Sequence, residues 1–312
     1  MDHLLALGSA ALKKAALNME AKAYLLGNEK LYKVMRKAAD RYIGGENLSE
    51  ALGKVTTAQT QGLKCSLEYM GENISSAEEA RAATQEFVNI CQEITVRKLN
   101  TTVSLDLSHI GLNVSRELCL QNLQDILQAA KAGGIEVIIS AEGTDQTDHV
   151  LDIYRSAAPT ADAIAITLQA YLHRTKEDFA DLVKLPGRIR VVKGAFATPA
   201  GLSMPRGAEL NKQYLYYIDT LLAQGHACSI ATHDPHIQQE ARKLVDHYRP
   251  ASHLYEFESL YGIQTDSLLA LKAEGYVAKL YFVYGKEWYL YLCNRIAEYP
   301  LNLFQAVADM VD

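Results

Sequence analysis

Polar side chains that could bind charge or move protons stand at the ends of a series of short apolar runs in this chain. An apolar run that ends in a carboxylate, a cation or a hydroxyl is informative, because burying such a group without a partner is costly. These residues are Glu68, Asp106, Ser140, Glu142, Gln169, Lys193, Thr232, His233, Glu256 and Tyr281. Brought together, groups of these types can bind a charged ligand and support proton transfer.

The runs themselves predict how these side chains are positioned. They recur about every 25 to 40 positions, with helix-like sequence between most of them. The eight runs begin at Lys64, Thr101, Ile135, Ala163, Arg188, Ala227, His253 and Ala278. Alternating strands and helices predict an α/β fold, a closed (β/α)8 TIM-like barrel of parallel strands. Enzymes with this fold work at the C-terminal ends of the strands, where the polar residues stand.

The segment before the first run has a different pattern. Apolar positions recur at helical spacing through residues 1–60, with a stop at Gly44 and Gly45 and a new start that Asn47 or Ser49 could cap. We expect residues 1–60 to form an N-terminal helical arm laid against a catalytic barrel of residues 61–312. A tail or a partner-binding segment is the alternative.

Composition narrows the class of protein. The 312 residues suffice for one barrel and an appendage, and 31 basic against 37 acidic side chains give a net charge of -6, which disfavours nucleic acid as a partner. Five cysteines without CxxC spacing indicate reduced thiols rather than disulfides or zinc. No run approaches the roughly 18 apolar residues of a membrane span. We therefore expect a soluble cytoplasmic protein.

Two cations on the fifth run indicate an anion-binding site. Arg190 and Lys193 stand among Ile and Val residues, and Gly194 follows directly, where a missing side chain lets the backbone approach a ligand. The alternative is a structural ion pair with a carboxylate inside the barrel. The candidate carboxylates for that pair are Glu68, Glu142 and Glu256.

Other motifs favour a hydrogen-bonding site over a metal or a hydrolase. Thr232 and His233 end the sixth run, but HxH and HxxxH patterns are absent, so we expect no metal and interpret His233 as a donor to a cofactor, or otherwise as a core histidine. The serines at strand ends lack the GxSxG elbow. Residues 197–210 form the one long connection without a clear helix and are a candidate lid.

The last strongly amphipathic segment predicts a binding wall. Tyr291, Arg295 and Glu298 fall on one helical face, with Asn294 beside them. An aromatic ring, a guanidinium and a carboxylate on the face toward the barrel mouth could bind a small polar ring. A surface pair between Arg295 and Glu298 is the alternative.

Together these segments resemble the flavin-dependent proline dehydrogenase family. The resemblance runs from about residue 56 to the C-terminus in seven ordered blocks. They are GLKCSLEYMGE, VSLDLSHIGL with ELCLQNL, LQAYLHRT, IRVVKGAF, IATHD, YEFESLYGI and VYGKEWYLYLCNRIAEYP. Membership would imply non-covalent FAD at the barrel mouth and hydride transfer from a secondary amine to flavin N5, giving an imine. Electrons would pass to a quinone or another acceptor.

The resemblance also implies roles for individual residues. Arg190 would lie near N5, where a cation supports the charge of reduced flavin, and with Ser140 would occupy the catalytic positions. The implied cofactor contacts are Ala141, Gln169, Arg190, Lys193, Gly194, Ala195, Thr232, His233 and Glu256. The implied substrate contacts are Asp106, Phe196, Leu260, Tyr281, Tyr291, Asn294 and Arg295.

Four positions depart from the family pattern. Asp106 replaces a lysine and Asn294 the first of two arginines that grip proline's carboxylate, while Ser140 replaces an aspartate and Phe196 a tyrosine. The first three exchanges lower the formal charge of the pocket by two units in sum. One cation to carboxylate contact at about 4 Å is worth roughly 4 kcal/mol at an effective dielectric near 20. Asp106 should therefore repel a proline carboxylate, and it could instead accept an ammonium or guanidinium group.

Three functions follow in order of preference. The first is FAD-dependent dehydrogenation of a cyclic or secondary amine other than free L-proline. The second is L-proline dehydrogenation to 1-pyrroline-5-carboxylate, with Arg295 gripping the carboxylate. The third is a redox-inactive binding or regulatory barrel. We expect a cytoplasmic location, with peripheral contact to the inner membrane and oligomerisation left open.

Overall fold

Eight parallel strands close a barrel in chain order in this computed structural model, which describes residues 2–16, 18–71, 74–161, 163–298 and 302–311. The strands are β1 (Lys64–Tyr69), β2 (Thr101–Leu105), β3 (Val137–Ile139), β4 (Ile164–Gln169), β5 (Ile189–Val192), β6 (Cys228–Ala231), β7 (Tyr255–Leu260) and β8 (Ala278–Tyr284). β1 pairs with both β2 and β8, which completes the closure. The predicted (β/α)8 barrel is confirmed.

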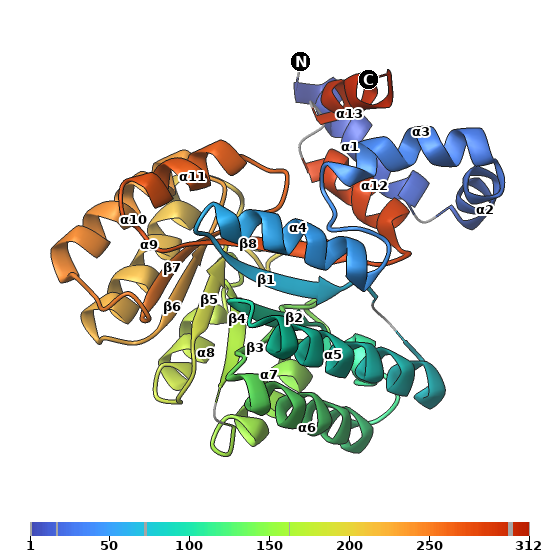
Figure 1. Ribbon diagram of the computed structural model, residues 1–312. Helices are drawn as coiled ribbons and strands as arrows, with labels where there is room; N and C mark the ends of the chain where they lie inside the picture. The colour runs from blue at the N-terminus through green and yellow to red at the C-terminus, as the bar shows by residue number, and fades with distance from the viewer. Residues whose placement is uncertain (1, 17, 72–73, 162, 299–301, 312) are drawn as a thin grey trace.

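Helices surround the barrel, and a further group of helices stands beside it (Figure 1). They are α1 (Asp2–Ala16), α2 (Met19–Gly27), α3 (Glu29–Asp40), α4 (Leu48–Thr60), α5 (Ala77–Arg97), η1 (Leu107–Ile110), α6 (Arg116–Gly133), α7 (Thr147–Ala157), α8 (Thr175–Leu182), α9 (Ala208–Ala223), α10 (Pro235–Tyr248), α11 (Thr265–Ala273), α12 (Trp288–Glu298) and α13 (Asn302–Val311). The helices α2, α3, α4, α5, α6 and α10 begin at an Asn, Ser or Asp side chain that accepts from a free N–H group. Asn47, rather than Ser49, caps α4 by accepting from the Glu50 N–H.

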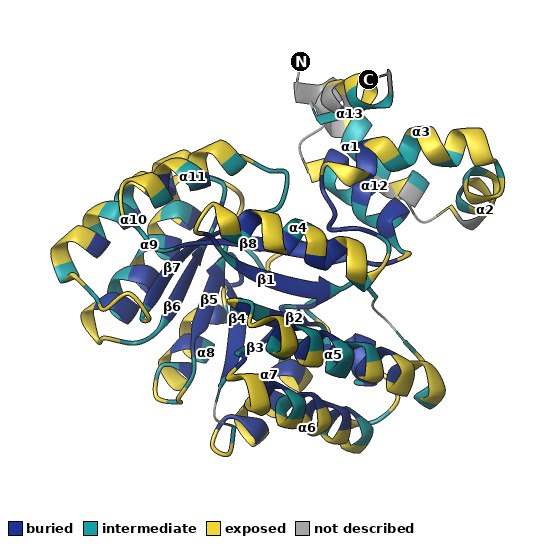
Figure 2. Cartoon of the chain, in the orientation of Figure 1, coloured by how far each residue is buried: buried dark blue, intermediate teal, exposed yellow. Residues whose placement is uncertain are grey.

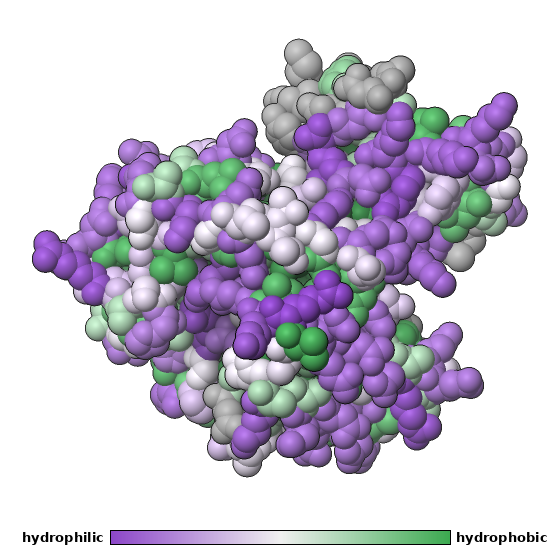
Figure 3. All heavy atoms as spheres, viewed as in Figure 1, coloured by the Kyte–Doolittle hydropathy of each residue, from purple (hydrophilic) through white to green (hydrophobic). Residues whose placement is uncertain are grey.

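The core lies between the strands and the inner faces of the helices. Figure 2 shows buried residues gathered on the strands and exposed residues on the outer sides of the helices. All three residues of β3 and all seven of β8 are buried, as expected of parallel strands covered on both faces. On the face shown in Figure 3, hydrophilic side chains predominate and apolar ones are scattered among them.

A helical cap with its own apolar core stands beside the barrel mouth. We use "helical cap" for α1–α3 together with α12 and α13, which pack on one another (Figure 1). Its core includes Tyr42, Ile43, Trp288 and Leu292, all buried. Within the N-terminal segment, α4 packs on β1 and β8. The C-terminal helices α12 and α13 therefore pack with α1–α3 of the N-terminal arm, because α1 and α3 cover the apolar face of α12.

Within the described residues, no helix is long and apolar enough to cross a membrane. Glu72, Tyr299 and Pro300, which fall in two of the sequence blocks, lie outside the described residues.

Two glycines with positive φ test how closely the barrel base is packed. A Cβ at Gly187 (φ +105°) would lie 2.2 Å from the Ile164 carbonyl oxygen, whereas one at Gly225 (φ +65°) would meet nothing within 4 Å. We expect Gly225→Ala to cost about 1 kcal/mol of unfolding free energy from backbone strain alone. Gly187→Ala should cost clearly more, because the backbone must also shift. Urea unfolding of both variants measures the difference, and equal losses would contradict the packing argument.

Candidate functional site

A cavity of about 1690 Å³ opens at the C-terminal ends of the strands. It exceeds the roughly 300–1,000 Å³ of sites for drug-sized ligands, so it can hold a large cofactor together with a small substrate. Of the site residues expected from the sequence, the following line it: Asp106, Ser140, Ala141, Gln169, Arg190, Lys193, Gly194, Ala195, Phe196, Thr232, His233, Leu260, Tyr281, Tyr291, Asn294 and Arg295. Glu256 is not among the lining residues.

Arg190 stands on β5 at the floor of the cavity with its guanidinium held from four sides. The side chain is buried and donates to Thr167 Oγ1 (2.8 Å), Ser104 Oγ (3.0 Å), Ser140 Oγ (3.1 Å) and Glu258 Oε1 (3.2 Å). These partners come from β4, β2, the end of β3 and β7. Such bonding fixes both the position and the plane of the guanidinium.

The carboxylate that pairs with Arg190 is Glu258, which the sequence analysis did not select. Glu258 also lies 2.7 Å from Lys279 Nζ, and Lys279 lies 2.5 Å from Glu256. Burial acts to lower the pKa of Lys279, but the two carboxylates hold it above its ordinary value. Residues two apart on a strand point to the same face, so Glu258 lies on the same face of β7 as Glu256. This spacing was the signal in the sequence that could have identified Glu258.

The cofactor contact expected of Glu256 does not fit this geometry. Glu256 lies lower on β7, almost fully buried, and accepts from Ser229 (2.6 Å). Burial alone would raise its pKa, but Lys279 and Arg188 bring the pKa below its ordinary range. Its carboxylate is therefore committed to the buried charges beneath the cavity.

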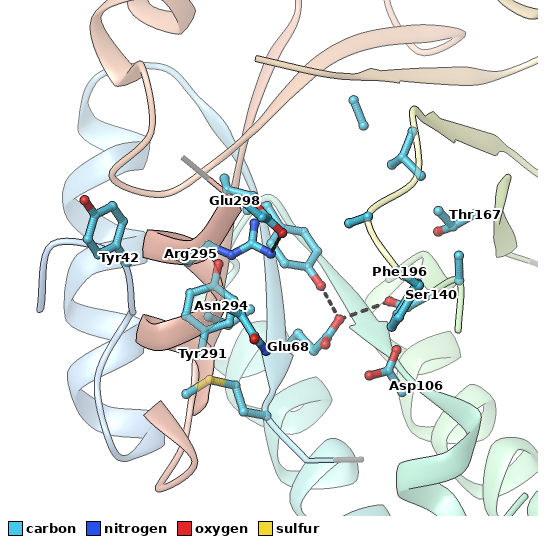
Figure 4. A pocket seen from close by; sticks show the side chains of 18 of the residues that line it. Tyr42, Glu68, Asp106, Ser140, Thr167, Phe196, Tyr291, Asn294, Arg295 and Glu298 are labelled. Carbon is cyan, nitrogen blue, oxygen red and sulfur yellow. Dashed lines mark hydrogen bonds and ion pairs between the residues drawn. The ribbon is translucent and has the colours of Figure 1, made fainter. Parts of the chain in front are cut away.

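Glu68, which the sequence analysis placed at a strand end but to which the family resemblance assigned no role, organises the other side of the floor. It is the penultimate residue of β1, lines the cavity and accepts from the Tyr281 hydroxyl and from Ser140 Oγ (3.1 Å). Figure 4 shows the bond between Ser140 and Glu68. Burial and the nearby charge of Glu68 raise the pKa of Tyr281 well above its ordinary value, and Asp106 adds to this effect. Two carboxylates therefore stand at the same end of the cavity. The signal for Glu68 was its period-two spacing from Ser66, whose hydroxyl bonds Ser104 inside the barrel.

α12 forms a wall of the cavity above these carboxylates. Arg295 stacks over the Tyr291 ring, 5.1 Å from its centroid, and donates to Glu298. Asn294 lies on the same side of α12 and faces the Glu68 region in Figure 4. The predicted wall and the alternative Arg295 to Glu298 pair therefore occur together.

The opposite end of the cavity combines a cation with a helix N-terminus. Lys193 Nζ lies 2.5 Å from Asp234 Oδ2, and Asp234 also caps α10 by accepting from the His236 N–H. Asp234 also accepts from the Ile237 N–H, so the first N–H groups of α10 are already bonded, and Lys193 is the group at this end that is suited to a phosphate. The structure gives its own reason for a glycine at position 194 (φ +107°). The Tyr171 ring occupies the space that a Cβ would fill.

His233 is held as a neutral hydrogen-bond donor. Its Nε2 accepts from the Leu260 backbone N–H (2.9 Å), so the ring proton resides on Nδ1. Burial, assisted by the charge of Arg295, lowers the pKa of His233 to about 4. The geometry suits the donor role expected from the sequence.

The candidate lid is anchored at several points. Met204 N–H donates to the Tyr171 carbonyl (2.7 Å), Ser203 bridges to Leu172, and Arg206 donates to the Gly194 carbonyl (2.5 Å). Its role as a lid stays a prediction. Among the described residues, no three His, Cys, Asp or Glu side chains converge on a metal position, and all five cysteines are buried and unpaired.

Comparison with known proteins gives one family. The family model described as proline dehydrogenase matches residues 51–299. Proline dehydrogenase 2 of Bacillus subtilis (strain 168) is 33% identical over 275 residues, covering 88% of this chain and 91% of the relative. Proline dehydrogenase 1 of the same strain is 36% identical over 270 residues, covering 86% and 88%.

The fold has a matching solved structure. Proline utilization A from Bdellovibrio bacteriovorus superposes with a TM-score of 0.78 at 15% identity. The match covers 95% of this chain but only 41% of that longer protein, and at this identity it supports the fold alone.

The pKa of His233 predicts a pH dependence of stability. Because the folded-state pKa is about 4 and the unfolded value about 6.5, neutral His233 stabilises the fold fully above pH 6.5, and this contribution is lost as pH falls toward 4. The unfolding free energy of the wild type should fall across this window, and we expect that of His233→Gln to fall by up to about 3 kcal/mol less. Urea unfolding between pH 4.5 and 7.5 measures it, with the exposed His149→Gln as the matched control. Parallel curves for His233→Gln and wild type would contradict the burial argument.

Proposed function

Because the chain belongs to the proline dehydrogenase family, a family of flavin-dependent oxidoreductases, we propose that it uses FAD to dehydrogenate a cyclic or secondary amine other than free L-proline. The product is the corresponding imine. A quinone or another acceptor reoxidises the enzyme. The cytoplasm, with peripheral contact to the inner membrane, is the proposed location.

Two parts of the cavity suit FAD, the end near Lys193 and the floor at Arg190. Lys193 would hold phosphate, and the Nδ1 proton of His233 offers a donor to the cofactor. The four-fold bonding of Arg190 presents a fixed cation where negative charge develops on reduction. When bound, FAD supplies the hydride acceptor that these side chains cannot supply.

The observation that carries the choice of substrate is the pair of carboxylates at the other end. Glu68 and Asp106 both line the cavity, and the negative charge of each raises the pKa of Tyr281. Asn294 adds a neutral amide to this part of the cavity. Arg295, the cation nearest to them on α12, is engaged by Glu298. A substrate carboxylate placed here would meet repulsion of the order of 4 kcal/mol from a single contact with an anion.

L-proline is the second candidate, and the comparisons favour it. The curated relatives, 33% and 36% identical over most of both chains, are named proline dehydrogenases. On this alternative, Arg295 would exchange Glu298 for the substrate carboxylate. The third candidate, a redox-inactive binding barrel, keeps the fold and loses turnover.

An anaerobic titration of the purified flavoprotein separates the three candidates. The absorption of oxidised flavin is followed as L-proline, then carboxylate-free and cationic cyclic amines, are added. Bleaching by an amine but not by L-proline supports the proposal. Bleaching by L-proline at ordinary concentrations supports the second candidate, and a protein that takes up no flavin supports the third.

Restoring the family's cations should restore proline oxidation. We expect Asp106→Lys with Asn294→Arg to raise kcat/KM for L-proline at least 100-fold. The first change turns a repulsive contact with the substrate carboxylate into an attractive one, and the second adds an attractive contact, each of about 4 kcal/mol. The control is Asp125→Lys with Asn113→Arg, which makes the same charge change at exposed positions on and before α6. No gain in the first variant would mean that the substrate's acidic end lies elsewhere.

A further inference from the structure

We propose that Glu68 is a catalytic residue of this site: its carboxylate binds the substrate's ammonium group and accepts its proton before the amine is oxidised. The inference rests on the proposed amine dehydrogenation and adds the proton acceptor. Ser140, which the sequence placed in a catalytic position, is a weak base, and Glu68 is the carboxylate to which it donates.

The position of Glu68 gives it access to the substrate. It is 9% exposed, lines the cavity, and lies at the C-terminal end of β1, where barrel enzymes hold their reacting groups. The Tyr281 hydroxyl from β8 and the Ser140 hydroxyl from the end of β3 both donate to its Oε2 and so fix the position of the carboxylate. Ser140 also accepts from Arg190, so Glu68 is connected to the floor of the site through one hydroxyl.

The chemistry requires such a group. An aliphatic amine is protonated near pH 7, as is lysine with a pKa of about 10.4, and an ammonium has no lone pair to assist hydride loss. An ammonium N–H bond therefore breaks first and its proton passes to Glu68. FAD, when bound, would supply the acceptor for the hydride of the adjacent C–H bond, and the nitrogen lone pair freed by Glu68 would form the C=N bond. Loss of the remaining N–H proton gives the neutral imine.

The charges facing Glu68 are compatible with this role. Tyr281 on β8 keeps its proton, because burial and the nearby carboxylates raise its pKa. Arg190 on β5 contributes positive charge, but Glu258 offsets it at 3.2 Å. Asp106, after β2, adds negative charge and so favours a cation, and the Tyr291 hydroxyl on α12 also senses the charge of Glu68.

Other carboxylates near the cavity are committed elsewhere. Glu258 is paired with Arg190 and Lys279 beneath the floor, and Asp234 with Lys193 at the far end. Asp106 is the rival that also raises the pKa of Tyr281, and the two variants Glu68→Gln and Asp106→Asn distinguish it from Glu68.

The first experiment measures the rate of flavin reduction by the best amine from pH 6 to pH 10. In Glu68→Gln we expect a loss of about 100-fold at pH 7, the scale of general-base catalysis, shrinking toward pH 10 as solvent deprotonates the amine. Glu68→Asp should recover part of the rate at pH 7. The control Asp219→Asn removes a carboxylate that accepts from the Tyr248 hydroxyl (2.9 Å), outside the cavity, and should leave the profile unchanged.

Two outcomes of this experiment overturn the proposal. A loss in Glu68→Gln of equal size at every pH would mean that Glu68 only supports the structure. A pH-dependent loss in Asp106→Asn with none in Glu68→Gln would assign the proton to Asp106.

The second experiment does not need turnover. Calorimetry on the flavin-loaded protein at pH 7 compares pyrrolidine, a cation, with tetrahydrofuran, its neutral isostere. We expect Glu68→Gln to weaken pyrrolidine binding at least 10-fold and to leave tetrahydrofuran binding unchanged. Equal effects on both ligands, or none, would overturn ammonium binding at Glu68. If no amine reduces the wild-type flavin, the proposed function and the proton transfer fail together, and calorimetry decides the ammonium site alone.

Discussion

The pairing of charges buried inside the barrel is the constraint on which the site depends. Lys279 is fully buried between Glu256 and Glu258, and Glu258 reaches upward to Arg190. Removing either partner would leave an uncompensated charge in a place that water does not reach, at a cost of about 3–5 kcal/mol. These pairs therefore hold Arg190 rigidly at the floor of the cavity, and the hydroxyls of the neighbouring strands complete its hydrogen bonds.

The cavity above this floor has two chemically different ends. Lys193 makes one end suitable for phosphate, whereas Glu68 and Asp106 make the other acidic. A strand order that runs once around the barrel places β1 and β2 on the side away from β5 and β6. A cofactor and a cationic amine can thus be bound at separate ends and meet near Arg190.

The helical cap completes the acidic end. α12 brings Tyr291 and Arg295 to the cavity only because its other face is buried against α1 and α3, in a core that includes Trp288 and Leu292. The wall of the site is therefore positioned by the packing of segments from both ends of the chain, and not by the barrel alone.

Much of this was predictable from local sequence, and the errors have physical reasons. The strands and the residues at their ends were predicted, since short apolar runs and the regular spacing between them are local signals. The sequence by itself determined the barrel, the mouth as the site and most of its lining. Depth along a strand is not local, so only the tertiary structure decided that Glu258 rather than Glu256 meets Arg190. Contacts between distant segments likewise decided that Tyr171 needs Gly194 and that Glu68 stands beneath Tyr281, because they depend on how elements pack and not on the residues next to them in the chain.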